Sequence, residues 1–182
     1  MNVIKTPLEG VVIIEPNVFG DTRGYFFESF SEQRFREEVA DVKFVQDNES
    51  KSSFGVLRGL HYQIGEFAQA KLVRVVYGKV LDVAVDMRKS SPTFGQYTSI
   101  ELSGENKRQF YIPRGFAHGF LVLSPEAIFQ YKCDNYYAPG KEGSVIFNDP
   151  TIGIDWGLDE KKFILSEKDT KAPLLKDAIL FE

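Results

Sequence analysis

Short apolar runs recur along this chain at close intervals, separated by Gly, Pro, Asn and Asp, and their spacing is what most restricts the fold. Runs of this length suit strands better than helices, and regular turn signals between them are typical of a sandwich or barrel. We expect strands at residues 11–15, 24–30, 56–63, 71–78, 79–87, 98–103, 108–113, 118–124 and 127–133. No internal repeat or change in composition divides the 182 residues. The pattern therefore predicts a single all-β domain, residues 1–182, folded as an antiparallel double-sheet jelly roll.

Helices are expected to be few and short. In SEQRFREEVA, residues 31–40, Ser31 is placed to cap a helix, and Phe35 and Val39 fall one turn apart on one face. A second short helix is expected near residues 171–180. The aromatic content of 14% favours strands elsewhere.

The clearest alternation lies in KVLDVAVDM, residues 79–87. From Leu81 onward its odd-numbered residues are apolar and point to one face, whereas Asp82 and Asp86 point to the other. The face with the two carboxylates is expected to be the wetter one. Gly78 separates this run from the preceding one and predicts a tight hairpin.

The formal net charge of −4 gives no reason to expect binding to nucleic acid or to an anionic membrane. The amino terminus lacks the apolar core of a signal peptide, and no run approaches the ~20 apolar residues of a membrane span. We therefore expect a cytoplasmic location. Cys133 is the single cysteine, which excludes an intrachain disulfide and a thiolate metal cluster, and we expect it to be a buried apolar residue.

The chain has two histidines, His61 and His118, and both lie in apolar strand-like segments. A single histidine in such a strand is more often a hydrogen-bonded core residue than a catalyst. Two cations, Arg58 and Lys71, lie in neighbouring apolar segments where their charged ends need a partner. A phosphate or an enolate oxygen of a ligand would be a suitable partner for these positive charges. Pairing of Arg58, Lys71 and Arg74 with carboxylates such as Asp82 or Asp86 on a solvated face explains the cations equally well.

The strand geometry argues against a site that contains both Arg58 and His61. Strict alternation along VLRGLHYQ puts Arg58 and His61 on opposite faces of the strand. Gly59 lies between them, and a bulge or twist at this glycine would bring both side chains to one face.

Metal binding has little support in the sequence. Many jelly-roll enzymes hold a metal with an H-x-H pair, and this chain has none. A site built from His61, His118 and one carboxylate stays open, but acid/base chemistry without a metal is favoured. No G-x-G-x-x-G or P-loop sequence supports a nicotinamide or ATP site.

Several long segments, in order from about Pro7 to Asp169, resemble the dTDP-4-dehydrorhamnose 3,5-epimerases. They are FGDTRGYFFESF, VQDNES, VLRGLHYQ, AKLVRVVYGKVLDVAVDMRKSSPTFG, YIPRGFAHGFLVLS, YKCDNYYAPGKEGSVIFNDPTIGIDW and LSEKD. The resemblance implies a cupin-type jelly roll that works as a homodimer, without metal or cofactor. It also implies the conversion of dTDP-4-dehydro-6-deoxy-D-glucose into dTDP-4-dehydro-L-rhamnose, by a base and an acid acting through an enolate.

The resemblance assigns four catalytic roles. His61 would be the base, because an imidazole takes up protons near neutral pH. Asp169 would orient that imidazole, and Tyr131 would deliver a proton from the opposite face. Lys71 would lie against the enolate oxygen, where a fixed cation stabilises the transition state.

Substrate contacts carry over from the same resemblance, together with a contribution of the amino-terminal segment to the partner's nucleotide site. The implied binding residues are Phe19, Arg23, Glu28, Gln46, Asp47, Asn48, Arg58, His118, Tyr137, Glu142 and Lys168. Arginine suits the diphosphate because its guanidinium binds phosphate with two hydrogen bonds. The pair Cys133 and Asp134 departs from the family pattern.

Three other functions stay open at this stage. Relatives that epimerise only C3 or only C5 share the same catalytic set. A metal-dependent cupin enzyme such as an oxygenase, and a non-catalytic sugar-nucleotide binding module, come from different classes of protein.

Overall fold

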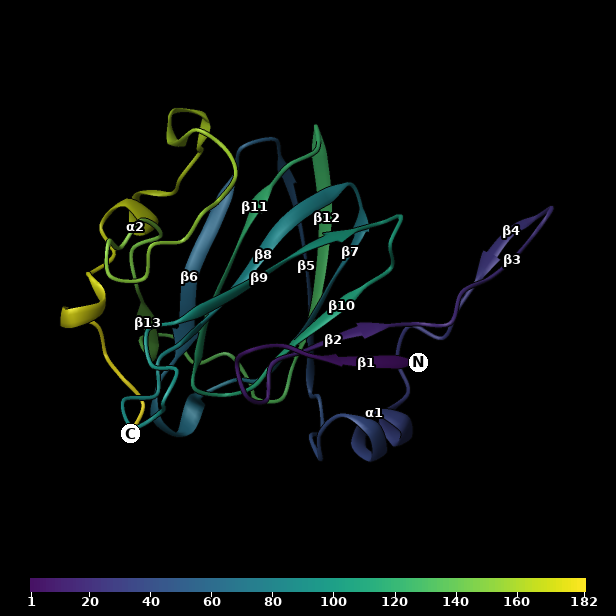
Figure 1. Ribbon diagram of the computed structural model, residues 1–182, viewed down its shortest axis with the longest axis horizontal. Helices are drawn as coiled ribbons and strands as arrows, with labels where there is room; N and C mark the ends of the chain where they lie inside the picture. The colour runs from purple at the N-terminus through teal and green to yellow at the C-terminus, as the bar shows by residue number, and fades with distance from the viewer.

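Strands dominate the computed structural model, which describes all 182 residues (Figure 1). A six-stranded sheet has the order β1-β2-β10-β7-β12-β5, and a five-stranded sheet has the order β13-β6-β11-β8-β9. All of their pairings are antiparallel. The strands are β1 Asn2–Lys5, β2 Val12–Glu15, β3 Phe19–Asp21, β4 Gly24–Phe26, β5 Gln46–Ser53, β6 Leu57–Gln63, β7 Lys71–Tyr77, β8 Lys79–Asp86, β9 Tyr97–Ser103, β10 Gln109–Ile112, β11 Phe116–Val122, β12 Glu126–Cys133 and β13 Glu142–Ser144. The predicted all-β jelly roll is confirmed.

Two short α-helices and three 3-10 turns complete the chain. They are α1 Glu32–Glu38, α2 Glu167–Thr170, η1 Gly65–Phe67, η2 Glu160–Lys162 and η3 Leu175–Asp177. The helix predicted at 31–40 is confirmed: Ser31 caps it by accepting a hydrogen bond from the amide of Arg34, and Phe35 is buried. Neither α-helix has the length or the run of apolar residues that a bilayer crossing requires.

The main core lies between the two sheets. Val73 and Phe129 enter it from the six-stranded sheet, and Val80 and Leu102 from the five-stranded sheet. Burying a side chain of this kind stabilises the fold by about 1.5–3 kcal/mol, so these facing residues hold the sheets together.

Both outer faces are also covered. The segment that follows β13 runs over the outer face of the five-stranded sheet and buries Leu57 and Leu60 against Trp156 (Figure 1). On the six-stranded sheet, α1 packs Phe35 against Tyr111. The five-stranded sheet therefore has two buried faces.

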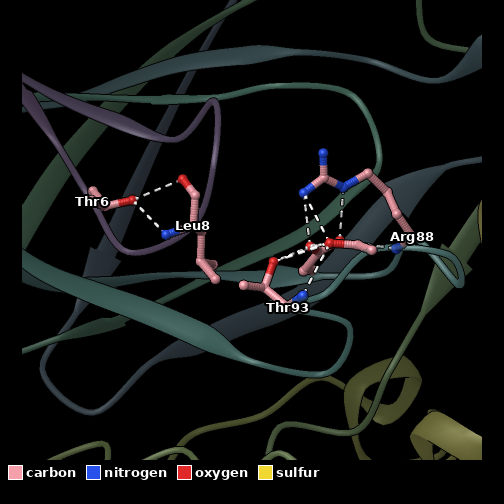
Figure 2. A network of polar contacts seen from close by, with 6 residues as sticks. Thr6, Leu8, Arg88 and Thr93 are labelled. Atoms are coloured by element: carbon pink, nitrogen blue, oxygen red, sulfur yellow. Dashed lines mark hydrogen bonds and ion pairs between the residues drawn. The ribbon is translucent and has the colours of Figure 1, made fainter.

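The wetter face predicted for β8 is wrong, because Asp82 and Asp86 are both fully buried. Hydrogen bonds compensate the Asp86 carboxylate: Arg88 donates from Nε at 2.9 Å and Nη2 at 2.8 Å, Ser91 donates at 2.6 Å, and Thr93 at 2.7 Å. Arg88 and Thr93 of this network are labelled in Figure 2. Burial acts to raise the pKa of Asp86, but these hydrogen bonds lower it to about 2. A buried carboxylate with several donors therefore replaces the expected solvated one.

The hairpin predicted at Gly78 is wrong as well. Strand β7 pairs with β10 and β12, whereas β8 pairs with β9 and β11, so Gly78 turns the chain from one sheet to the other. Its φ is +78°, and a Cβ there would lie 2.0 Å from the carbonyl oxygen of Glu126. Consecutive apolar runs cannot reveal whether they share a sheet.

Three further elements differ from the predictions. The expected helix at 171–180 is only the 3-10 turn η3, and α2 lies before it. The expected strand at 24–30 is limited to β4, which forms with β3 a hairpin that projects away from the body of the molecule (Figure 1). Strand β5 was not predicted, because its sequence QDNESKSS is wholly polar.

Candidate active site

A cavity of about 410 Å³ between the sheets is lined by all four residues predicted to be catalytic, His61, Lys71, Tyr131 and Asp169. His61 comes from β6 of the five-stranded sheet, and Lys71 and Tyr131 come from β7 and β12 of the six-stranded sheet. Imidazole and phenol therefore approach the cavity from opposite walls. Asp169 enters from α2.

The predicted bulge at Gly59 is confirmed by the strand register. His118 of β11 lies opposite His61, but Phe120, only two residues later, lies opposite Arg58, three residues away. The extra residue restores the side-chain alternation, so Arg58 and His61 both line the cavity. Gly59 has φ +135°, and a Cβ on it would lie 2.5 Å from Cα of Gly119. Two glycines in contact make this bulge possible.

The His61 imidazole is held by a carboxylate. Its Nε2 lies 2.6 Å from Oδ1 of Asp169, whose side chain is only 4% exposed. Ser166 donates a hydrogen bond to the other oxygen, Oδ2, at 2.7 Å. Burial acts to raise the pKa of Asp169, but the hydrogen bonds from His61 and Ser166 outweigh it and hold that pKa below its usual value. Asp169 is thus an ionised acceptor.

The opposite wall carries an ammonium beside a phenol. Nζ of Lys71 lies 5.9 Å from the centre of the Tyr131 ring. Burial lowers the pKa of Lys71, although Cys133 and Asp82 oppose this effect. Burial also raises the pKa of Tyr131, so its hydroxyl keeps its proton at neutral pH. Tyr131 can therefore act as a proton donor, and Lys71 can stabilise a negative oxygen.

The second histidine forms a second pair. His118 Nε2 lies 2.9 and 3.0 Å from the two carboxylate oxygens of Asp82, and its ring stacks on Phe129. Burial raises the pKa of Asp82, while His118 and Lys71 act against that rise. His118 lines the cavity, so both histidines are paired with a carboxylate and face the same space.

Arg58 remains available for an anion. Its Nε donates to Ser52 at 3.1 Å, and it has no carboxylate partner in the structure. The alternative in which Arg58, Lys71 and Arg74 form ion pairs on a solvated face with Asp82 or Asp86 is therefore wrong, because both carboxylates are buried and bonded elsewhere. Arg74 donates to Gln130 instead.

Five of the predicted binding residues form a chain of contacts near the pair of His61 and Asp169. Lys168 binds Glu142 at 2.8 Å, which lowers the pKa of Glu142, with Tyr137 and His61 contributing to the shift. The amide of Tyr137 donates to Gln46 at 3.1 Å, and Gln46 donates to Asn48 at 3.1 Å. These contacts join β13, α2 and β5 around His61.

Four predicted binding residues lie apart from the cavity. Phe19, Arg23 and Glu28 belong to the projecting β3–β4 hairpin and the segment after it, and Phe19 is 66% exposed. Asp47 points to the outer face of the six-stranded sheet and binds Lys132 at 3.0 Å. Asp47 lines a second pocket together with Tyr131, whereas Phe19, Arg23 and Glu28 share no pocket with the four predicted catalytic residues of their own chain.

Two functional candidates were missed. Ser166 precedes Asp169 by three residues, and this S-x-x-D spacing is a capping signal that could have revealed the contact. Asp82 was assigned to a solvated face, although a carboxylate within an apolar strand needs a buried partner. Nowhere in the chain are three or more His, Cys, Asp or Glu side chains grouped so that they could hold a metal ion.

Two antiparallel sheets that enclose a polar cavity define this chain as a jelly roll of the cupin type. The chain belongs to the dTDP-4-dehydrorhamnose 3,5-epimerase family, whose family model matches residues 5–177. It is therefore an isomerase of the epimerase class.

Comparison with known proteins supports the family at high identity. The dTDP-4-dehydrorhamnose 3,5-epimerase of Salmonella typhimurium is 58% identical over 183 residues, covering 100% of both chains. A Legionella pneumophila epimerase, solved in complex with dTDP-4-keto-L-rhamnose, is 54% identical with a TM-score of 0.93, covering 97% of this chain and 93% of that one. ChmJ, a 3′-monoepimerase from Streptomyces bikiniensis solved with dTDP-quinovose, is 37% identical with a TM-score of 0.89, covering 95% and 87%.

Proposed function

We propose that this chain epimerises both C3 and C5 of dTDP-4-dehydro-6-deoxy-D-glucose, giving dTDP-4-dehydro-L-rhamnose for dTDP-L-rhamnose biosynthesis. The observation that carries the proposal is the approach of His61 and Tyr131 to one cavity from opposite sheets. Inversion of a carbon needs a proton removed from one face and another delivered to the other face. A base and an acid on facing walls meet that requirement.

The first step is removal of a proton next to the C4 ketone, which acidifies the hydrogens on C3 and C5. Because Asp169 is ionised and accepts from Nε2, the neutral His61 ring carries its proton there and its lone pair on Nδ1. That lone pair takes the proton from carbon. Asp169 then stabilises the imidazolium.

The second step is stabilisation of the enolate and its reprotonation. Lys71 lies on the cavity wall, where burial lowers its pKa, and in its protonated form its charge would favour the enolate over the ketone. Tyr131 then delivers its proton to carbon from the far side, after which solvent reprotonates the phenolate and takes the proton from the His61 imidazolium. No cofactor is required, since the C4 carbonyl itself accepts the electron pair.

Binding would use the remaining predicted residues. Arg58 reaches the cavity without a carboxylate partner and suits the diphosphate. Phe19, Arg23 and Glu28 lie too far out to serve their own chain, which supports a homodimer in which the β3–β4 hairpin serves the partner's nucleotide site. We propose that all 182 residues form one domain. The cytoplasmic location stays a prediction from the sequence.

The test is hydrogen exchange during turnover in deuterated water. The purified protein is given dTDP-4-dehydro-6-deoxy-D-glucose, and deuterium at C3 and C5 is measured by NMR. We expect label at both carbons. Label at one carbon would demote the protein to a mono-epimerase, the alternative that its similarity to ChmJ supports. Binding of dTDP without exchange at either carbon would leave only a binding module.

A further inference from the structure

Ser166 makes two hydrogen bonds with the same residue, Asp169. Its Oγ lies 2.7 Å from Oδ2 of the carboxylate and 3.2 Å from the backbone nitrogen. The second contact is the N-cap of helix α2, whose first residue is Glu167. Ser166 thus fixes the start of the helix and the carboxylate of its third residue together.

The direction of both bonds follows from what each group can donate. A backbone amide only donates, so Oγ of Ser166 accepts from the nitrogen of Asp169. The single hydroxyl proton is then free for Oδ2, and an ionised carboxylate only accepts. The remaining oxygen, Oδ1, faces Nε2 of His61 at 2.6 Å. One continuous series of bonds therefore joins the helix cap to the imidazole.

We propose that Ser166 is a positioning residue for the proton transfer: its hydroxyl locks the Asp169 carboxylate so that Oδ1 keeps the His61 proton on Nε2. This inference rests on the proposed function. Without the hydroxyl, the carboxylate can rotate about its side-chain bond, and its free oxygen holds a proton more tightly. Both effects reduce the fraction of enzyme in which Nδ1 of His61 carries a lone pair.

Other titratable and charged groups near His61 also affect where its ring carries a proton. They are Glu142 on β13, Lys168 on α2, Arg58 on the same strand, Glu49 on β5, Lys71 and Tyr131 on the facing wall, and the His118 and Asp82 pair beside the imidazole. None of them contacts Oδ2 of Asp169, whose hydrogen-bond partner is Ser166.

Three substitutions separate the effect of the Ser166 hydroxyl on Asp169 from its effect as the N-cap of α2. Ser166→Gly removes the hydroxyl but leaves a residue that is nearly as good an N-cap. Ser166→Ala removes both functions. Ser166→Thr keeps both, and its extra methyl has room because Ser166 is an exposed residue. Ser31→Ala is the matched control, since Ser31 caps α1 in the same way and is not among the predicted site residues.

The measurements are kcat, KM and the pH profile of kcat/KM for deuterium exchange. We expect Ser166→Gly and Ser166→Ala to lower kcat about tenfold with little change in KM, the size of one hydrogen bond to a charged group. The acidic limb of the profile should move to higher pH in both, while Ser166→Thr restores the wild-type profile. Ser31→Ala should lower the melting temperature and leave the profile unchanged.

Two outcomes would overturn the inference. A wild-type profile and kcat in Ser166→Gly, with a loss only in Ser166→Ala, would reduce Ser166 to a helix cap. A rise in KM with unchanged kcat would make it a substrate contact instead.

A measurement without substrate separates this inference from the proposed function. The chain has only two histidines, so NMR can follow each imidazole in the substrate-free protein. In Ser166→Gly, the ring-nitrogen chemical shifts of His61 should show a larger fraction of the tautomer with its proton on Nδ1, and those of His118 should not change. This change would support the role of Ser166 even if exchange in deuterated water failed to show an epimerase. An unchanged His61 tautomer would refute that role even in an active enzyme.

Discussion

His61 and Tyr131 line one cavity from opposite sheets, His61 from β6 of the five-stranded sheet and Tyr131 from β12 of the six-stranded sheet. A flat sugar enolate held between the sheets would present one face to each residue. The five predictions that follow test this arrangement and the fold that supports it.

Replacing the base should stop the reaction before any bond to hydrogen breaks. In His61→Ala, we expect deuterium exchange at C3 and C5 to fall at least about 100-fold, because no other group occupies the position of the imidazole. NMR of the sugar after incubation in deuterated water gives the rates. Ser31→Ala serves as the control for handling and stability. Persistent exchange at either carbon would mean that another group is the base.

Removing the acid should separate exchange from inversion. In Tyr131→Phe, His61 can still take a proton and return a deuteron from its own side, so exchange continues while inversion stops. Product configuration by NMR and label by mass spectrometry distinguish the two. The control is Tyr111→Phe, a buried tyrosine on the outer face of the same sheet, which should leave both unchanged. Normal inversion in Tyr131→Phe would exclude this phenol as the acid.

A side chain at Gly59 should destabilise the bulge. The added Cβ of Gly59→Ala would lie 2.5 Å from Cα of Gly119, and backbone cannot move as a flexible side chain can. We expect the free energy of unfolding to fall by about 3 kcal/mol, measured by urea denaturation. Gly24→Ala is the matched control, since Gly24 has nearly the same φ, +134°, with no atom within 4 Å of the new Cβ. Equal losses in the two variants would show that φ alone matters and that the close approach does not.

Acid should weaken the network around Asp86. Its pKa is lowered to about 2, so its carboxylate stabilises the fold fully above the unfolded value of 3.8, and this contribution is lost as the pH falls through about 2. The expected loss is about 2 kcal/mol. Asp86→Asn should lack this part of the pH dependence, so the difference in unfolding free energy between wild type and variant should shrink on acidification. A constant difference from pH 6 to pH 2 would contradict the assignment.

A chelator should leave the reaction unchanged. Both histidines are paired with carboxylates rather than grouped with further ligands, so we expect exchange to continue after dialysis against EDTA. Elemental analysis of protein purified without chelator is the complementary measurement. Stoichiometric iron or manganese, together with loss of activity in EDTA, would instead favour a metal-dependent cupin enzyme.

Periodicity and glycine placement predicted the fold class, helix α1 and the bulge at Gly59, because each depends on residues close in sequence. The pairing of the strands could not be predicted in the same way. Gly78 turns the chain from one sheet to the other, but from the sequence alone it resembles a glycine in a hairpin turn. Strand β5 carried no apolar signal, because its inward residues Asn48, Ser50 and Ser52 are polar.

The proposed catalytic residues were assigned mainly from resemblance to a family. From residue types alone, His61 and His118 looked equivalent, and the structure pairs each with a carboxylate. The contact between His61 and Asp169 spans 108 positions of sequence, and no local pattern encodes it. The contact of Ser166 with Asp169 could have been predicted, because the three-residue spacing between them is a local capping signal.

Asp169 follows every strand of the fold in the order of synthesis. A nascent chain emerging from the ribosome could therefore pair both sheets and form the cavity walls while the imidazole of His61 still lacked its carboxylate. The proposed base would gain its orienting carboxylate last, when α2 docks beside β6.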